Sequence, residues 1–345
     1  MLLFAWRRLT PPAFIGGAEL TEAEIATILA TSSDVEMVGS YENPRDPTQS
    51  SLPWLTSLLE EANVSFEISP SGVVQYFWNG IACLCAPQSQ VDDLILSRSS
   101  KARVVWTSQE GSDAISRSVD PGRVATYVHS VSDTGLRALT SGPRWIFAPS
   151  LFVADFLAER GFARAHLLRP PYPIAAPITS PGTRVLFVNP VPEKGVTVAT
   201  SLAERFASVH FDFLEAWRPI AETEKADLPA NVTLLSHRRD PSPLFESTRV
   251  LLVPSIVEDA SPRVISEAAC RGIPSVGSLR GGIPELIAQS EYVIDPSDID
   301  LWTIALEKLL APGEAHEQAS RKQRQLSQSL YPNVDAILHQ AALIE

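Results

Sequence analysis

Residues Val250–Ile287 read VLLVPSIVEDASPRVISEAACRGIPSVGSLRGGIPELI. Val250–Val253 is an apolar run of the length of a buried strand, and a loop follows it as far as Pro262. Because proline is favoured in the first turn of a helix, we expect a helix over Pro262–Arg271. A second short strand is expected at Ser275–Val276. A strand, a helix and another strand in this order predict a parallel sheet covered by helices.

The same alternation extends toward both ends of the chain. Further strands are expected at Leu2–Trp6, Val35–Ser40, Val73–Cys85, Arg103–Thr107, Ala125–His129, Trp145–Pro149, Arg184–Val188, Val209–Leu214 and Val232–Leu235. Helices are expected at Gly17–Ala30, Leu52–Ala62, Leu151–Arg160, Gly195–Ala207, Leu301–Leu310 and Glu314–Ser329. The pattern therefore predicts an α/β protein.

A proline-rich segment interrupts the alternation. Five prolines lie from Pro170 to Pro181, and proline fixes φ and donates no backbone hydrogen bond. We expect a stiff, extended connector there. It predicts an N-terminal domain over residues 1–171 and a C-terminal domain over residues 172–328.

Composition narrows the class of partner. The 345 residues carry a formal net charge of −12, which disfavours nucleic acid and anionic lipid as general partners, so a phosphate-bearing ligand needs a local cationic site. The odd, sparse cysteines, Cys83, Cys85 and Cys270, do not suit a disulfide framework, and core packing is expected for the first two. The sequence has no apolar run long enough to span a bilayer, and its start does not follow the order of a signal peptide. These features predict a cytoplasmic protein.

Four segments carry a family resemblance. Val250–Ile287 is the longest of them. The others are IGGAE at Ile15–Glu19, PSLFVADFLAERG with the following RPPYP at Pro149–Pro173, and VLFVNPVPEKG at Val185–Gly195. The resemblance covers nearly the whole chain and is strongest from Val185 to Ile294. Taken in their order along the chain, the four segments resemble those of the retaining family 4 glycosyltransferases of the glycosyl transferases group 1.

The resemblance implies a GT-B fold, in which two Rossmann-like parallel-sheet domains face each other across a cleft. The first domain would bind the acceptor and the second a nucleotide-sugar donor, and a C-terminal helix over residues 329–345 would cross back to the first. The implied reaction is a retaining, metal-independent transfer of a hexose from an NDP-sugar, with a UDP-glucose type favoured, as in polysaccharide biosynthesis. The acceptor would be a saccharide, a lipid-linked or a small-molecule hydroxyl, with at most peripheral membrane contact.

The resemblance also implies a donor site. Lys194 would neutralise the diphosphate, Asp259 would contact hydroxyls of the donor sugar, and Glu267 would accept hydrogen bonds from the ribose. Glu258 is the alternative to Asp259. An exposed loop lysine and a helix acid also have ordinary structural explanations, as a solvated charge and a capping acid.

A second cation is expected near Lys194. The family commonly has a Gly-Arg pair before this lysine, where the present chain has Asn189 and Pro190. Arg263 is the candidate for the missing charge, although its spacing also suits an i, i+4 partner of Glu267. Arg280 is a weaker candidate.

The remaining candidate residues lie at expected strand ends and helix starts. Ser261, Pro262 and Val264 surround a helix start, which is a favourable place for an anion. Gly16 and Gly17 are candidates for close backbone approach to a ligand. The resemblance implies that Gly281 and Gly282 border the donor sugar, that His237 and Arg238 lie at the nucleobase, and that His129 faces the reacting centre. Each has a structural alternative, namely a turn, a helix start or a buried histidine.

Other readings of the sequence remain open. Asp298-Ile299-Asp300 matches an Asp-x-Asp metal motif, but Asp298 directly precedes an expected helix and is better explained as its N-cap. A non-catalytic nucleotide-sugar-binding homologue is the main alternative function, because the Gly-Arg pair is missing. An epimerase or phosphorylase of the same fold is a further one.

Overall fold

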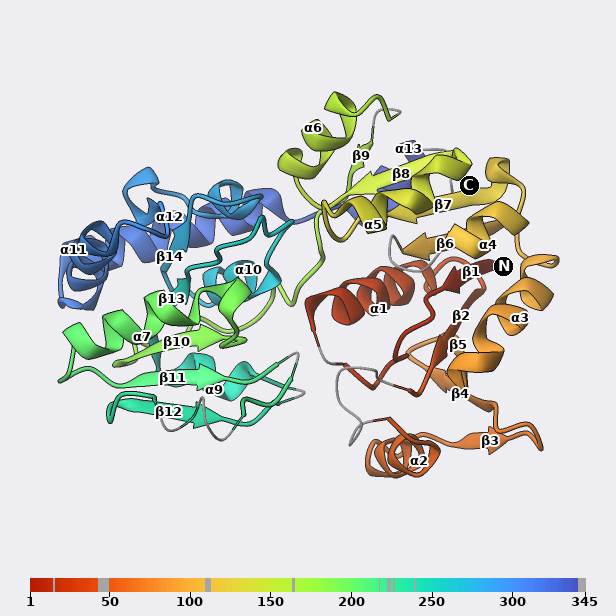
Figure 1. Cartoon of the computed structure of the whole chain (residues 1–345), viewed down its shortest axis with the longest axis horizontal. Coiled ribbons are helices and arrows are strands. Elements are labelled where there is room, and N and C mark those ends of the chain that lie inside the picture. The colour runs from red at the N-terminus through yellow and green to blue at the C-terminus, as the bar shows by residue number, and fades with distance from the viewer. Residues whose placement is uncertain are drawn as a thin grey trace. The chain divides into compact units, whose positions relative to one another are not determined.

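The computed structural model describes residues 1–14, 16–42, 50–108, 113–162, 165–216, 218–221, 225, 227–238 and 240–340. It divides into two compact units. Unit 1 comprises Met1–Pro171 and Pro332–Glu345, and unit 2 comprises Tyr172–Tyr331. Each unit has its own sheet, with helices against it (Figure 1).

Unit 1 contains a nine-stranded sheet in the order β3-β4-β5-β2-β1-β6-β7-β8-β9. The strands are β1 (Leu2–Ala5), β2 (Val35–Ser40), β3 (Phe66–Ile68), β4 (Val74–Trp78), β5 (Ile81–Ala86), β6 (Val104–Ser108), β7 (Val124–Tyr127), β8 (Trp145–Ala148) and β9 (His166–Leu167). The α-helices are α1 (Gly17–Leu29), α2 (Leu52–Glu61), α3 (Gln88–Ser99), α4 (Asp113–Ser118), α5 (Asp133–Leu136), α6 (Leu151–Glu159) and α13 (Val334–Gln340). In the part of the sheet with the order β5-β2-β1-β6-β7-β8-β9, every strand pairs parallel with its neighbours.

The parallel strands β1, β2, β6, β7 and β8 of unit 1 are buried on both faces of the sheet, as strands of parallel sheets are, whereas the antiparallel strands β3 and β4 have exposed residues. In β1, Leu2 and Phe4 belong to one apolar core together with residues of α1 and α13, whereas Leu3 and Ala5 belong to a second core with residues of α3 and α4. This alternation follows from the two-residue period of a strand. It puts α1 and α13 on the same face of the sheet, where they also contact each other.

One expected strand is wrong. The single strand expected at Val73–Cys85 is a hairpin, in which β4 and β5 pair antiparallel and β3 adds a further antiparallel strand at the edge. The turn consists of Asn79 and Gly80, which both have positive φ, of 45° and 83°. An Asn-Gly pair between apolar runs is a strong hairpin signal, so the turn could have been predicted from the sequence.

Unit 2 contains a six-stranded parallel sheet in the order β12-β11-β10-β13-β14-β15. The strands are β10 (Arg184–Val188), β11 (Phe211–Leu214), β12 (Val232–Leu235), β13 (Thr248–Val253), β14 (Ser275–Ser278) and β15 (Val293–Ile294). The α-helices are α7 (Val196–Arg205), α9 (Ser242–Ser247), α10 (Arg263–Ala269), α11 (Ile299–Leu310) and α12 (Glu314–Leu330). Most elements therefore lie where the alternation predicts them, with α9 as an additional short helix.

Two helix starts refine the sequence interpretation. Pro262 is the N-cap of α10 rather than its first helical residue, so the helix is shorter at both ends than expected. Asp298 is the N-cap of α11, and its carboxylate accepts a hydrogen bond of 3.1 Å from the amide of Leu301. The capping explanation of the Asp-x-Asp motif is thus confirmed. Within the described ranges, the structure contains no helix with the length and apolarity needed to cross a membrane.

Candidate functional site

The candidate donor site lies where the strand order of unit 2 reverses. The chain passes from β10 outward to β11 and β12, and then returns to β13 on the other side of β10. In open α/β sheets, ligands bind beyond the carboxyl ends of the strands at such a switch point. The segments that leave β10 and β13 there carry Lys194 and Asp259.

The turn after β10 holds Lys194 in a fixed place. Asn189 has a φ of 67°, so it adopts the left-handed conformation that glycine and asparagine tolerate best. Lys194 lies in the 3-10 turn η4 (Pro192–Lys194), which ends at Gly195 with a φ of 82°. A Cβ on Gly195 would lie 2.0 Å from the carbonyl oxygen of Pro254, so only glycine lets this turn pack against the end of β13.

Backbone hydrogen bonds join this turn to the loop after β13. The amide of Ile256 donates to the carbonyl of Glu193 at 3.0 Å. On the side-chain level, the Lys194 ammonium forms an ion pair with the Asp259 carboxylate, and both side chains are largely buried. The hydroxyl of Ser255 donates to the same carboxylate oxygen at 3.2 Å. The structure therefore brings Lys194 and Asp259 together.

The loop after β14 completes this cluster. Gly281 has a φ of 55°, and a Cβ there would lie 2.2 Å from the carbonyl oxygen of Asp259. The amide of Gly282 donates to that carbonyl at 2.7 Å, and the amide of Gly281 donates to the Glu258 carboxylate. Glu258 and Asp259 thus have different partners, since Glu258 binds a backbone amide and Asp259 binds the lysine.

Arg263 and Glu267 form a second pair. The Arg263 guanidinium donates to the Glu267 carboxylate at 3.1 Å along α10, with exposed side-chain fractions of 4% and 14%. This is the i, i+4 contact that the spacing allowed. Ser261, Pro262 and Val264 are all half-buried around the start of the helix.

The nucleobase candidates lie farther along the same edge of the sheet. His237 and Arg238 follow β12, and β11 separates that strand from β10. His237 is half-buried and Arg238 is exposed. They are therefore placed beyond the same carboxyl ends as Lys194, but two strands away.

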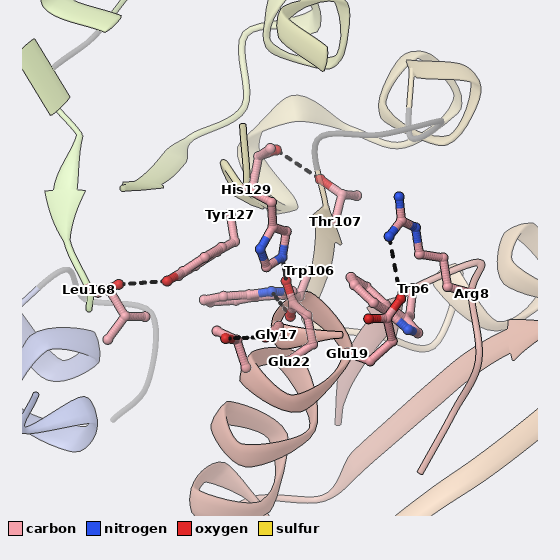
Figure 2. Close-up of polar contacts among 12 residues, drawn as sticks. Trp6, Arg8, Gly17, Glu19, Glu22, Trp106, Thr107, Tyr127, His129 and Leu168 are labelled. Atoms are coloured by element: carbon pink, nitrogen blue, oxygen red, sulfur yellow. Dashed lines mark hydrogen bonds and ion pairs between the residues drawn. The ribbon is translucent and has the colours of Figure 1, made fainter. Parts of the chain in front are cut away.

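Unit 1 has a comparable switch point, between β1 and β6. His129 lies just past the end of β7, next to β6, and Gly16 is the N-cap of α1. The Nε2 atom of His129 lies 2.8 Å from Oε1 of Glu22, a fully buried carboxylate on α1 (Figure 2). Gly17 is exposed at the start of the helix.

Glu22 is a polar residue at this site that the sequence interpretation missed. Leu20, Ile25, Ile28 and Leu29 have the sequence spacing of one apolar helix face, but in α1 Leu20 and Ile28 are only half-buried. Glu22 shares the buried face with Ile25 and Leu29, as helical spacing allows. The signal was an acidic residue in register with the buried apolar positions.

Residues 215–326, which include Asp259, Arg263, Glu267 and Gly281, match the family model of the glycosyl transferases group 1. No curated protein sequence matches this chain.

Solved structures match over almost the whole chain. A sucrose-phosphate synthase from Thermosynechococcus elongatus has 14% identity and a TM-score of 0.72, covering 99% of this chain and 97% of that one. Anabaena HepE in complex with UDP-glucose has 15% identity and a TM-score of 0.72, covering 99% and 98%. The G117R mutant of S. aureus TarM in complex with fondaparinux, alpha-GlcNAc-glycerol and UDP has 10% identity and a TM-score of 0.69, also covering 99% and 98%.

The fold is GT-B. In this GT-B chain the glycine-supported cluster of Lys194, Glu258 and Asp259 lies at the switch point of unit 2. Among the residues that the structure describes, there is no group of three or more His, Cys, Asp or Glu side chains suited to hold a metal ion.

Proposed function

We propose that this chain is a glycosyltransferase that moves a hexose from a nucleoside-diphosphate sugar to a hydroxyl group of a saccharide or another acceptor. The observation that carries the proposal is the contact between Lys194 and Asp259 at the switch point of unit 2. It joins a cation suited to a diphosphate with a carboxylate suited to sugar hydroxyls. Asp259 also lies inside the segment that matches the family model.

The roles of the site residues follow from their charges. Lys194 stabilises the negative charge that develops on the leaving diphosphate, and Arg263 is the second cation. Asp259 accepts hydrogen bonds from the donor sugar, and Glu267 accepts them from the ribose. Backbone groups around Gly281, Gly282, Ser261, Pro262 and Val264 line the diphosphate and the sugar.

The other candidates extend the site. Asn189 borders the diphosphate from the turn after β10, and His237 with Arg238 holds the nucleobase. Unit 1 binds the acceptor, with His129, Gly16 and Gly17 bordering the reacting centre. The reduced cysteines, free in the described residues, accord with a cytoplasmic location.

We infer a retaining reaction. The acceptor hydroxyl attacks the anomeric carbon of the sugar from the same face as the departing diphosphate. As the bond to the diphosphate breaks, a diphosphate oxygen takes the proton of the acceptor hydroxyl. Retention then needs no protein nucleophile. Side-chain cations supply the charge stabilisation that a metal ion provides elsewhere, so we expect transfer to continue in excess EDTA.

UDP is the favoured nucleotide. HepE, a structural neighbour, is described in complex with UDP-glucose. Thermal shift with a panel of UDP-, GDP- and ADP-sugars tests this choice, since a ligand at 100 times its Kd adds about 2.7 kcal/mol of stability. A rise in unfolding temperature with UDP-sugars alone supports UDP as the nucleotide. A rise only with GDP- or ADP-sugars would show that the donor carries that nucleotide instead.

Turnover separates an enzyme from a non-catalytic binder. Donor hydrolysis and transfer are measured for the wild type, for Lys194→Ala and for Lys308→Ala as a matched control, because Lys308 is a half-exposed lysine of unit 2 paired with Glu291. We expect Lys194→Ala to lose about 10²–10³ in rate and the control to retain the wild-type rate. A wild type that binds the donor but never turns it over would support the binder instead.

A further inference from the structure

The Glu22 side chain binds two partners from two different strands. Its Oε2 atom accepts a hydrogen bond of 2.8 Å from Nε1 of Trp106 on β6, and its Oε1 atom lies 2.8 Å from Nε2 of His129 beyond β7 (Figure 2). The residue is fully buried. Burying a carboxylate is costly unless its oxygens are hydrogen-bonded, so both contacts are needed to hold it there.

The chemistry of the partners determines which nitrogen of His129 carries hydrogen. The indole of Trp106 only donates, so one oxygen of Glu22 is an acceptor. When Glu22 is ionised, the other oxygen is an acceptor too, and Nε2 of His129 must then carry a hydrogen. In a neutral imidazole this leaves Nδ1 with a free lone pair.

Aromatic packing fixes the plane of the imidazole. The rings of Tyr127 and His129 have centroids 4.7 Å apart, and the ring of Trp6 packs edge-on at 5.8 Å. The Tyr127 hydroxyl itself donates to the carbonyl of Leu168 at 2.9 Å. His129 therefore has both its tilt and its tautomer set by neighbours, while 17% of its side chain remains exposed.

Charged groups around this pair have their own contacts. Glu19, one turn before Glu22 on α1, pairs with Arg8 at 3.4 Å, and Arg8 also lies over the ring of Trp6 at 5.8 Å. Figure 2 shows this pair to one side of the Glu22–His129 contact. Glu22 is thus the carboxylate that contacts His129.

We propose that Glu22 is a positioning residue that holds His129 in its Nε2–H tautomer and thereby presents Nδ1 as a hydrogen-bond acceptor to a hydroxyl group of the ligand in unit 1. The inference rests on the proposed function, because a sugar transferase supplies such a hydroxyl. It goes further by naming the group that aims His129 and the nitrogen that meets the ligand.

Glu22→Gln gives a sharp test, because the variant has the same shape but one acceptor oxygen. The Trp106 indole donates its hydrogen bond to that oxygen. The amide NH₂ group of Gln then faces His129 and donates to Nε2, which must be the unprotonated nitrogen. We expect the tautomer to switch to Nδ1–H. Adding Trp106→Phe removes the competing donor, which lets the amide oxygen turn to His129 and restores Nε2–H.

The tautomer is read from ¹⁵N chemical shifts of the imidazoles at alkaline pH, where an ordinary imidazole is neutral. His129→Asn assigns the signal. The expected order is Nε2–H in the wild type, Nδ1–H in Glu22→Gln and Nε2–H again in the double variant. A wild type with Nδ1–H, or a tautomer unchanged by Glu22→Gln, overturns the proposal. Circular dichroism and thermal unfolding confirm that each variant is folded, and Trp106→Phe alone controls for lost packing.

Kinetics test the ligand contact. Glu22→Gln is expected to lower kcat/KM by about 10- to 100-fold, and the Trp106→Phe background to recover part of that loss. In the His129→Asn background, Glu22→Gln should have no further effect, since Glu22 acts through His129. Equal losses in both backgrounds would show a merely structural role and overturn the proposal. The NMR result needs no turnover, so absence of transfer in every variant would refute the proposed function while leaving the tautomer assignment measured.

Discussion

Lys194 and Asp259 form an ion pair across the switch point of unit 2, although 65 residues separate them in the sequence. Lys194 comes from the turn after β10, and Asp259 from the loop after β13. A cation that is paired costs less to bury than an isolated one. A diphosphate that binds Lys194 therefore meets a carboxylate already in contact with it.

Asp259→Asn separates binding of the nucleotide from transfer of the sugar. The variant removes the negative charge next to Lys194 but keeps the shape of the side chain. We expect UDP to bind at least as tightly as to the wild type, and transfer to fall about 10- to 100-fold because a charged hydrogen bond to the sugar is lost. Calorimetry with UDP and initial rates measure the two effects.

Asp300→Asn is the matched control for Asp259→Asn. Asp300 is an aspartate of the same unit that pairs with Arg205 at 2.6 Å, but 80% of its side chain is exposed. Exposed ion pairs contribute little, so neither UDP affinity nor rate should change. In the wild type, the Asp259 carboxylate and the diphosphate of UDP compete for Lys194. Weaker UDP binding in Asp259→Asn, with unchanged binding in Asp300→Asn, would contradict this competition.

Glu267→Ala should destabilise unit 2. The variant removes a carboxylate partner from the buried guanidinium of Arg263. Breaking a buried ion pair by deleting one partner typically costs about 3 kcal/mol or more. Urea unfolding measures the loss, and Glu267→Gln should lose less because its amide oxygen still accepts from Arg263. Equal stability of Glu267→Ala and the wild type would rule out a structural contribution of the pair.

Alanine substitutions distinguish glycines that permit a close contact from glycines that only permit a turn. Gly195→Ala adds a Cβ 2.0 Å from the Pro254 carbonyl at a φ of 82°. A Cβ at Gly142 would meet nothing within 4 Å at a φ of 71°. Gly142→Ala should therefore lose only the free energy of placing alanine in the left-handed conformation, about 1–2 kcal/mol. We expect Gly195→Ala to lose more stability than Gly142→Ala, and to lose transfer activity because Lys194 is displaced. Thermal unfolding and rates of both variants check this, and similar losses would contradict it.

His316 introduces a pH-dependent contribution to stability. Its ring is buried and its Nδ1 lies 2.9 Å from the carbonyl of Leu309, and burial lowers its pKa from 6.5. The unfolded chain therefore binds the proton more readily. Its contribution is full above pH 6.5 and is lost as the pH falls from there toward the lowered pKa.

The His316 contribution appears as a difference between variants. Urea unfolding midpoints of the wild type and His316→Gln, measured between pH 5 and 8, should converge as the pH falls. His210→Gln changes a half-buried histidine of the same unit and serves as the control. The His316 contribution is still present in this variant, so its unfolding midpoint should not converge with that of His316→Gln in any way that differs from the wild type. Parallel curves for the wild type and His316→Gln would contradict the assignment.

Much of the fold could be predicted because its signals are local. The apolar strand at Val232–Leu235 and the helix ending near Leu310 follow from a few neighbouring residues each. The β4–β5 hairpin was missed although Asn79-Gly80 signals it, because the long apolar run resembles one strand. The end of α10 near Ala269 also has a local signal, because Gly272 follows with a φ of 82°, the left-handed conformation in which many helices end.

The sequence alone determined the alternation of strands and helices. It also determined the spacing that puts Asp259 on the loop after β13 and Glu267 on the helix that follows this loop. Only the tertiary structure decided the partners: Lys194 with Asp259, and Glu22 with His129, which are 107 residues apart. The physical reason is that local propensity and periodicity act over a few residues. Which distant side chains meet depends on the order of strands in the sheet, and that order is set by the packing of the whole unit.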